Sequence, residues 1–113
     1  MEMINEENKE ENTTWVMITP EDTCAWKLKE AHLESEPNLE ELQMYVGGYI
    51  EEIPTGWLMK GLHNMFVNEE GKMDKLPHNQ LATQLLDNPV PIVGTVVVEW
   101  DNKYNDKKGW MIE

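Results

Sequence analysis

Residues 44–54 read MYVGGYIEEIP, and the pair of glycines in this stretch decides how the middle of the chain is organised. Apolar residues recur at helical spacing just before the pair, so we predict a helix over residues 39–46. Asn38 is a favoured N-cap, and Glu41 follows three residues later, as in a capping box. Gly47 then supplies the left-handed residue that commonly ends a helix.

The two glycines support two interpretations. In the first, they end the helix and reverse the chain, and Gly48 allows close packing or a second unusual φ at the start of the next strand. In the second, the backbone amides of Gly47 and Gly48 form an anion-binding nest. Tyr49, Lys72 and Asn79 would then add hydrogen bonds or charge, if the fold gathers these turns. The sequence leaves both interpretations open.

The rest of the chain is interpreted from alternating apolar and polar residues and from turn signals. Gly71 lies in a turn that we expect to need a positive φ. Asn79 is the predicted N-cap of a second short helix over residues 76–89. The predicted fold class is α+β, an antiparallel sheet of about five to six strands with two short helices packed on it. The expected strands cover residues 13–20, 25–33, 49–54, 56–67, 91–100 and 107–113, where residues 56–67 form one or two strands with a bulge or bend at Gly61.

The charge balance restricts the partners. The 113 residues include 22 acidic and 9 basic side chains, which gives a net charge of −13, and every basic residue is lysine. Nucleic acids are bound mainly by neutralising phosphates, so we expect no direct nucleic-acid binding. The expected partner is a small nucleotide ligand in a local pocket or a host protein. Residues 1–12 are predicted to form an acidic flexible leader, and residues 13–113 a single α+β domain.

The expected location follows from cysteine usage and hydropathy. Cys24 is the only cysteine, so no internal disulfide can form, which suits a reducing cytoplasm. The first residues do not resemble a signal peptide. No stretch approaches the roughly 20 apolar residues of a membrane span. We therefore expect a soluble cytoplasmic protein without membrane contact.

No motif predicts catalysis or a cofactor. The sequence has no phosphate-binding loop. Its three histidines are far apart and no cysteine pair accompanies them, so no metal site is predicted. Without a catalytic constellation, we expect the protein not to be an enzyme. Among the five tryptophans, Trp57 is the candidate for a stacking or partner-binding surface, because it follows a turn glycine near the double glycine.

Three runs carry a family resemblance: LQMYVGGYIEEIP (42–54), FVNEEGKMDKLPHNQLAT (66–83) and IVGTVVV (92–98). They resemble a family of small bacteriophage and mobile-element domains of unknown function, with VGGYIE, NEEGK, LPxN and IVG blocks in this order. The resemblance covers residues 38–98. It implies a phage or prophage-like origin, action in the bacterial host cytoplasm and an accessory role, but no reaction.

Two functions stay open. The first is a phage-encoded, non-enzymatic binding protein that interferes with bacterial host defence by sequestering a cyclic-nucleotide-type immune signal. The alternative is an acidic protein–protein inhibitor or DNA mimic that binds a host enzyme. A homo-oligomer formed through an edge strand suits either function. The candidate ligand-binding residues are Gly47, Gly48, Tyr49, Trp57, Asn68, Gly71, Lys72 and Asn79.

Overall fold

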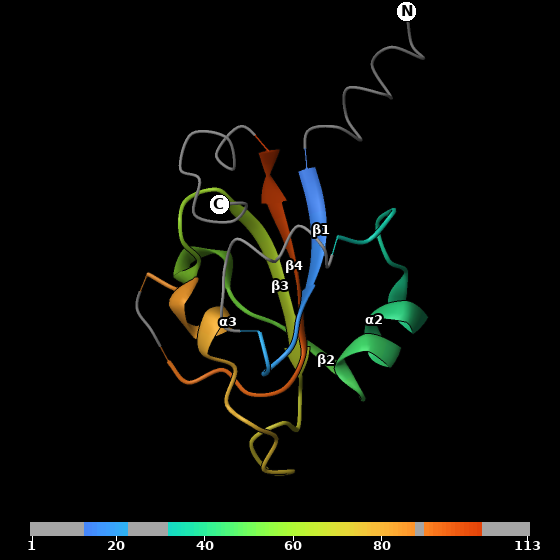
Figure 1. The fold of residues 1–113 in the computed structure, drawn as a ribbon, viewed down its shortest axis with the longest axis vertical. Helices are drawn as coiled ribbons and strands as arrows, with labels where there is room; N and C mark the ends of the chain where they lie inside the picture. The colour runs from blue at the N-terminus through green and yellow to red at the C-terminus, as the bar shows by residue number, and fades with distance from the viewer. Residues whose placement is uncertain (1–12, 23–31, 88–89, 103–113) are drawn as a thin grey trace, which may run out of the picture.

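Four strands form one antiparallel sheet with the order β1-β4-β3-β2 in the computed structural model, which describes residues 13–22, 32–87 and 90–102 (Figure 1). No helix in these residues is long and apolar enough to cross a membrane. The strands are β1 (Thr13–Ile18), β2 (Ile50–Glu52), β3 (Leu62–Asn68) and β4 (Val96–Asp101). The helices are α2 (Leu39–Val46), the short 3-10 helix η2 (Thr55–Trp57) and α3 (Gln80–Gln84).

The α+β class is confirmed, but the predicted number of strands is wrong, because the described residues contain four. The predicted strand over 56–67 is interrupted by η2 and by a turn at Gly61, whose φ is 102°. Most of the predicted strand over 25–33 lies outside the described residues, and its end at His32 forms only an isolated bridge to β1. The predicted strand over 107–113 lies wholly outside them.

The second predicted helix and the strand predicted over 91–100 are both shorter than expected. The predicted helix over 76–89 contracts to α3, because Leu86 instead forms an antiparallel bridge with the residue that follows η2. The predicted strand over 91–100 begins only at β4. Pro91 has no amide for a ladder hydrogen bond, and Gly94 bends the chain with a φ of 78°.

The predicted helix caps are confirmed. Oδ1 of Asn38 accepts a hydrogen bond of 2.8 Å from the Glu41 amide, and Oε1 of Glu41 accepts one of 2.9 Å from the Asn38 amide. Gly47 ends α2 in the left-handed conformation, with a φ of 87°. Oδ1 of Asn79 accepts from the Ala82 amide at 3.1 Å and so caps α3. Local hydrogen bonds therefore fix both helix starts.

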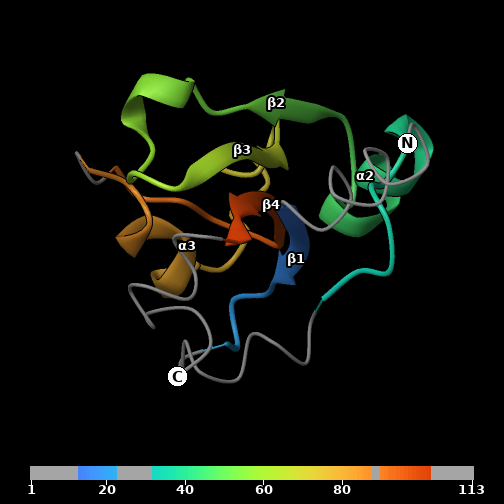
Figure 2. The same cartoon turned by 90° about the horizontal axis from the view of Figure 1, so that it is seen from above.

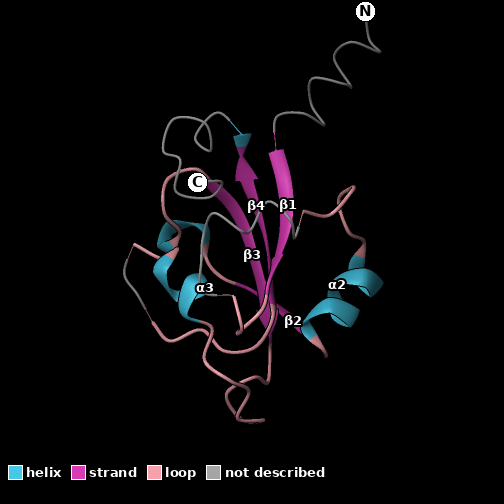
Figure 3. Cartoon of the chain, in the orientation of Figure 1, coloured by secondary structure: helices cyan, strands magenta, loops and turns pink. Residues whose placement is uncertain are grey.

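The helices cover opposite faces of the sheet, as Figures 2 and 3 show. Because successive side chains of a strand point to opposite faces, β4 contributes to two hydrophobic cores. Val98 and Trp100 belong to the larger core, on the face covered by α3. Val97 packs with Trp15 and with Leu42 of α2 in the smaller core on the other face. Both faces of the sheet thus pack against a hydrophobic core. Among the described residues, β2 is an edge strand.

Candidate functional site

The two glycines end α2 and use their amides in doing so. The Gly47 amide donates a hydrogen bond of 2.9 Å to the Gln43 carbonyl oxygen, and the Gly48 amide donates one of 3.0 Å to the same oxygen. A Cβ on Gly48 would lie 3.1 Å from Nδ2 of Asn68, so any larger residue there would have to displace the Asn68 side chain. Helix termination is therefore the correct interpretation, and a nest built from these two amides is not available.

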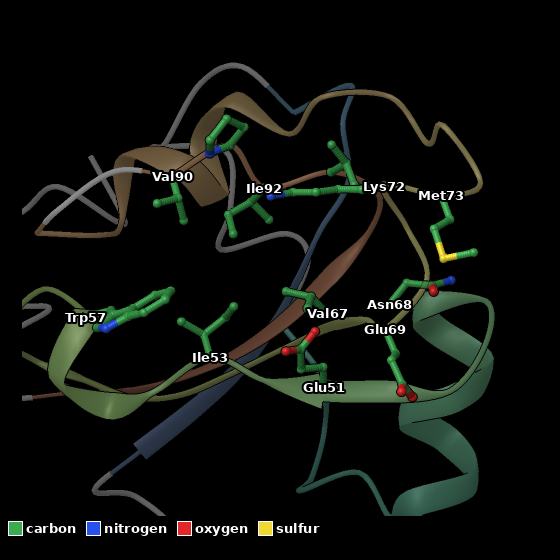
Figure 4. A pocket seen from close by; sticks show the side chains of 12 residues that line it. Glu51, Ile53, Trp57, Val67, Asn68, Glu69, Lys72, Met73, Val90 and Ile92 are labelled. Carbon is green, nitrogen blue, oxygen red and sulfur yellow. The ribbon is translucent and has the colours of Figure 1, made fainter.

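A groove runs along the β2 edge of the sheet, on the face that α3 covers; we call it the Trp57 groove (Figure 4). Its volume is about 220 Å³. Figure 4 shows Trp57, Ile53 and Glu51 along one side and Val90, Ile92 and Lys72 along the other. The groove is lined by Glu51, Ile53, Trp57, Val67, Asn68, Glu69, Lys72, Met73, Val90, Pro91, Ile92 and Val93.

Trp57 forms one end of the groove and is held by backbone hydrogen bonds. Its amide donates to the Pro54 carbonyl oxygen at 2.9 Å, and its carbonyl oxygen accepts from the Asp87 amide at 2.9 Å. The side chain is nevertheless 46% exposed. The backbone of Trp57 is therefore held in place, and its indole is an apolar surface that a ligand can reach, whereas Trp15 and Trp100 are buried.

The floor of the groove is apolar and its charged groups lie at the sides. Ile53, Val67 and Ile92 are buried beneath it. Lys72 is the only cation among the residues that line it, and its ammonium has no ion-pair partner within the described part of the chain. The carboxylate of Glu51 faces the groove from β2 (Figure 4). The site therefore combines an aromatic surface with one positive charge and hydrogen-bond acceptors.

A second depression lies on the other side of Asn68; we call it the Tyr49 hollow. Its volume is about 290 Å³. The Tyr49 ring is 69% exposed, and the charged groups are the carboxylates of Glu70 and Asp74. No lysine lines it, so it offers no attraction to a phosphate. The hollow is lined by Gln43, Gly47, Gly48, Tyr49, Asn68, Glu70 and Asp74.

The predicted site residues therefore do not form one site. Trp57, Asn68 and Lys72 come together in the Trp57 groove, whereas Gly47, Gly48 and Tyr49 line the Tyr49 hollow with Asn68. Gly71 and Asn79 line neither. Asn68 is common to both depressions but is buried, and its side chain is already hydrogen-bonded within the fold.

Gly71 and Asn79 have structural roles. The expected positive φ at Gly71 is wrong; glycine is needed there because a Cβ would lie 2.9 Å from Cγ2 of Val93. Asn79 is fully buried, and its Nδ2 donates to the carbonyl oxygens of Ile18 (3.0 Å) and Gly94 (2.8 Å). Together with the cap of α3, these hydrogen bonds give both polar atoms of the Asn79 side chain a partner.

Sequence reasoning missed several residues of the Trp57 groove. Glu51 and Ile53 are two positions apart in an extended segment, so alternation could have placed them on one face. Pro91 and Ile92 could not have been found in this way, because they reach the groove from a loop that was expected to be a strand. Such loops come together only through tertiary packing.

Side chains of metal-ligating types also occur in the described residues outside the two depressions. No group of three or more histidine, cysteine, aspartate or glutamate side chains could hold a metal ion in the parts of the chain described above. Nε2 of His63 lies 3.5 Å from Oδ2 of Asp101 at the opposite end of β3 from the groove; the histidine is exposed and the aspartate is half-buried. Cys24 lies outside the described residues.

Comparison with known proteins gives a family without a function. A family profile described as Domain of unknown function (DUF3846) matches residues 13–107. The match confirms the resemblance to a family of unknown function and extends beyond the expected residues 38–98. No curated protein and no solved structure matches the sequence.

Proposed function

We propose that this chain, which belongs to the DUF3846 family of domains of unknown function, is a non-enzymatic binding protein that holds a nucleotide in the Trp57 groove. One observation carries the proposal: the groove joins a half-exposed indole, an apolar floor and an ammonium without an ion-pair partner in the described residues. These features complement the base, the sugar and the phosphate of a nucleotide.

Each part of the groove has a chemical task in this proposal. The base stacks on Trp57, an interaction that contributes about 1–3 kcal/mol per base. Lys72 pairs with a phosphate beside an apolar surface, where the attraction is stronger than in open water. Glu51 accepts hydrogen bonds from ribose hydroxyls, as an acidic residue does in dinucleotide-binding folds.

Size and charge narrow the ligand class. The groove, at about 220 Å³, is smaller than the roughly 300–1,000 Å³ of a pocket that encloses a whole drug-sized ligand. It therefore takes one nucleotide unit. A single lysine that shares the groove with Glu51 and Glu69 favours a phosphodiester, which carries one negative charge, over a triphosphate. Cyclic nucleotides contain such phosphodiesters.

The biological part of the proposal is interference with bacterial host defence. It rests on the phage or prophage-like origin that we expect from the sequence blocks in residues 38–98. A protein that binds a cyclic-nucleotide signal without consuming it lowers the free concentration of that signal. Sequestration of this kind needs no catalytic group. It needs a protein that is abundant relative to the signal and binds it tightly.

A thermal-unfolding screen tests the proposal. The full chain is melted with cyclic mononucleotides, cyclic dinucleotides, nucleoside monophosphates and ATP, each in excess. A ligand at a hundred times its Kd stabilises the folded state by about 2.7 kcal/mol. We expect stabilisation by at least one cyclic nucleotide, and recovery of that ligand unchanged by mass spectrometry. No stabilisation by any compound would contradict binding, and conversion of the ligand would contradict a non-enzymatic role.

A further inference from the structure

β2 is the last strand in the sheet order, so no other strand in the described part of the chain pairs with its outer edge. The Tyr49 carbonyl oxygen accepts a hydrogen bond of 2.8 Å from the amide that follows β3, and the Ile53 amide donates one of 2.9 Å to a β3 carbonyl. The backbone hydrogen-bonding groups of successive strand residues point in alternate directions, so the N–H and C=O groups of Glu51 also point toward β3. The N–H and C=O groups of Ile50 and Glu52 therefore point away from the sheet.

The side chains on this edge are acidic on both faces of the sheet. Glu51 and Glu52 are both exposed, and as neighbours in a strand they point to opposite faces. Glu51 lies on the face of the Trp57 groove, and Glu52 lies on the face of α2. An incoming strand thus meets a carboxylate whichever face its side chains occupy.

These charges decide what can occupy the edge. In an antiparallel pairing with β2 of a second copy, the carboxylates of the two copies would oppose one another, and like charges opposite each other destabilise a sheet. Each chain also carries a net charge of −13. A segment with lysine or arginine side chains is attracted to this edge, because its positive charges pair with Glu51 and Glu52 while its backbone adds a strand to the sheet.

We propose that the β2 edge binds an extended, basic segment of a partner protein by strand addition. Main-chain hydrogen bonds to Ile50 and Glu52 provide the affinity, and the two carboxylates select a basic sequence. This inference does not require Trp57 or Lys72. Glu51 belongs to both proposed sites, so the test is made at Glu52, which lies on the other face of the sheet from the Trp57 groove.

The test uses a defined peptide and a variant that blocks only the edge. The probe is a fluorescent, end-blocked Thr-Val-Lys-Lys-Val-Thr peptide, and its binding to the full chain is followed by anisotropy. Glu52→Pro removes the outward amide while leaving the β3 ladder intact, a position where an edge strand tolerates proline. Glu52→Gln removes only the charge. Glu34→Gln removes an equal charge from the exposed loop before α2 and is the matched control.

Strand addition predicts a graded result. We expect Glu52→Pro to weaken peptide binding at least about tenfold, Glu52→Gln about threefold, and Glu34→Gln not to change it. A peptide N-methylated at alternate amides should lose binding to the unaltered chain, which keeps the test valid if Glu52→Pro does not fold. The proposal is overturned by equal binding of the N-methylated peptide, by equal binding to a folded Glu52→Pro variant, or by no binding at all. Pairing of the chain with itself at micromolar concentration, lost in Glu52→Pro, would also overturn it in favour of a second copy.

Discussion

The side-chain amide of Asn68 donates a hydrogen bond of 3.1 Å from Nδ2 to the carbonyl oxygen of Val46. This bond joins the end of β3 to the last residue of α2. Oδ1 of the same side chain accepts a hydrogen bond of 2.8 Å from the Glu70 amide, at the start of the turn that carries Lys72. One buried amide thus fixes the helix end and the turn, and with them the walls of both the Trp57 groove and the Tyr49 hollow.

Asn68→Ala is expected to lower the free energy of unfolding by about 1–3 kcal/mol, because it leaves the Val46 carbonyl and the Glu70 amide without their partners. Asn68→Asp retains the acceptor for Glu70 but loses the donor to Val46. It also sets a carboxylate against that carbonyl. Urea unfolding gives the loss for both bonds in Asn68→Ala, and the loss of the Val46 contact together with this repulsion in Asn68→Asp. A loss below about 0.5 kcal/mol in Asn68→Ala would contradict the role given to this side chain.

Asn79→Ala is expected to cost more than Asn68→Ala, because Asn79 is fully buried and makes three hydrogen bonds. The variant leaves the carbonyls of Ile18 and Gly94 unsatisfied and removes the cap of α3, so we expect a loss of about 3 kcal/mol or more. Asn79→Ser is the matched control, because serine can still cap the helix but cannot reach both carbonyls. Denaturant unfolding should rank the stabilities as unaltered chain, serine variant, alanine variant. A serine variant as stable as the unaltered chain would contradict a role for the two carbonyl contacts, and equal stability of the two variants would contradict the role of the cap.

Gly71→Ala is expected to destabilise the fold by about 1–3 kcal/mol, because the added methyl group would overlap Val93. Gly56→Ala is the matched control. No atom lies within 4 Å of a Cβ built there, and the φ of Gly56 is not in the left-handed region, so this change should be neutral or stabilise by up to about 1 kcal/mol. Thermal unfolding of the two variants, together with Gly71→Ala/Val93→Ala, is the measurement. If the added Val93→Ala change does not restore part of the stability lost in Gly71→Ala, overlap with Val93 is not the cause of that loss.

His32 is expected to make stability depend on pH. Partial desolvation lowers the pKa of this imidazole below its ordinary value of 6.5, because the ring of this surface residue lies edge-on to Trp100 with 5.7 Å between centroids. As the pH falls through 6.5, the unfolded chain takes up a proton at His32 that the folded chain does not, so the free energy of unfolding decreases. We therefore expect stability to fall less between pH 7 and pH 5 in His32→Gln than in the unaltered chain. Parallel pH profiles for the two proteins would show that His32 is not responsible.

The parts of the structure that could be predicted from sequence are those fixed by local interactions. The capping box of Asn38 and Glu41 and the glycine at position 47 act within one helix, and α2 has the predicted bounds. The predicted helix over 76–89 is too long, because tertiary pairing of Leu86 overrides local propensity. Sequence reasoning identified Trp57 and Lys72 separately. Their meeting in one groove depends on how a 3-10 helix, a turn and a distant loop pack together, which no local pattern encodes.

The central claim is that Trp57 and Lys72 act on one bound nucleotide, and isothermal titration calorimetry tests it most directly. A cyclic dinucleotide and a cyclic mononucleotide are titrated into the full chain, Trp57→Ala, Lys72→Gln and Lys75→Gln. Lys75→Gln makes the same charge change on the same turn, outside the groove. We expect binding to the unaltered chain, weakening of about tenfold or more in the first two variants, each equivalent to about 1.4 kcal/mol, and no change in the third. Absence of heat with both nucleotides, or equal affinity in all four proteins, would contradict the account.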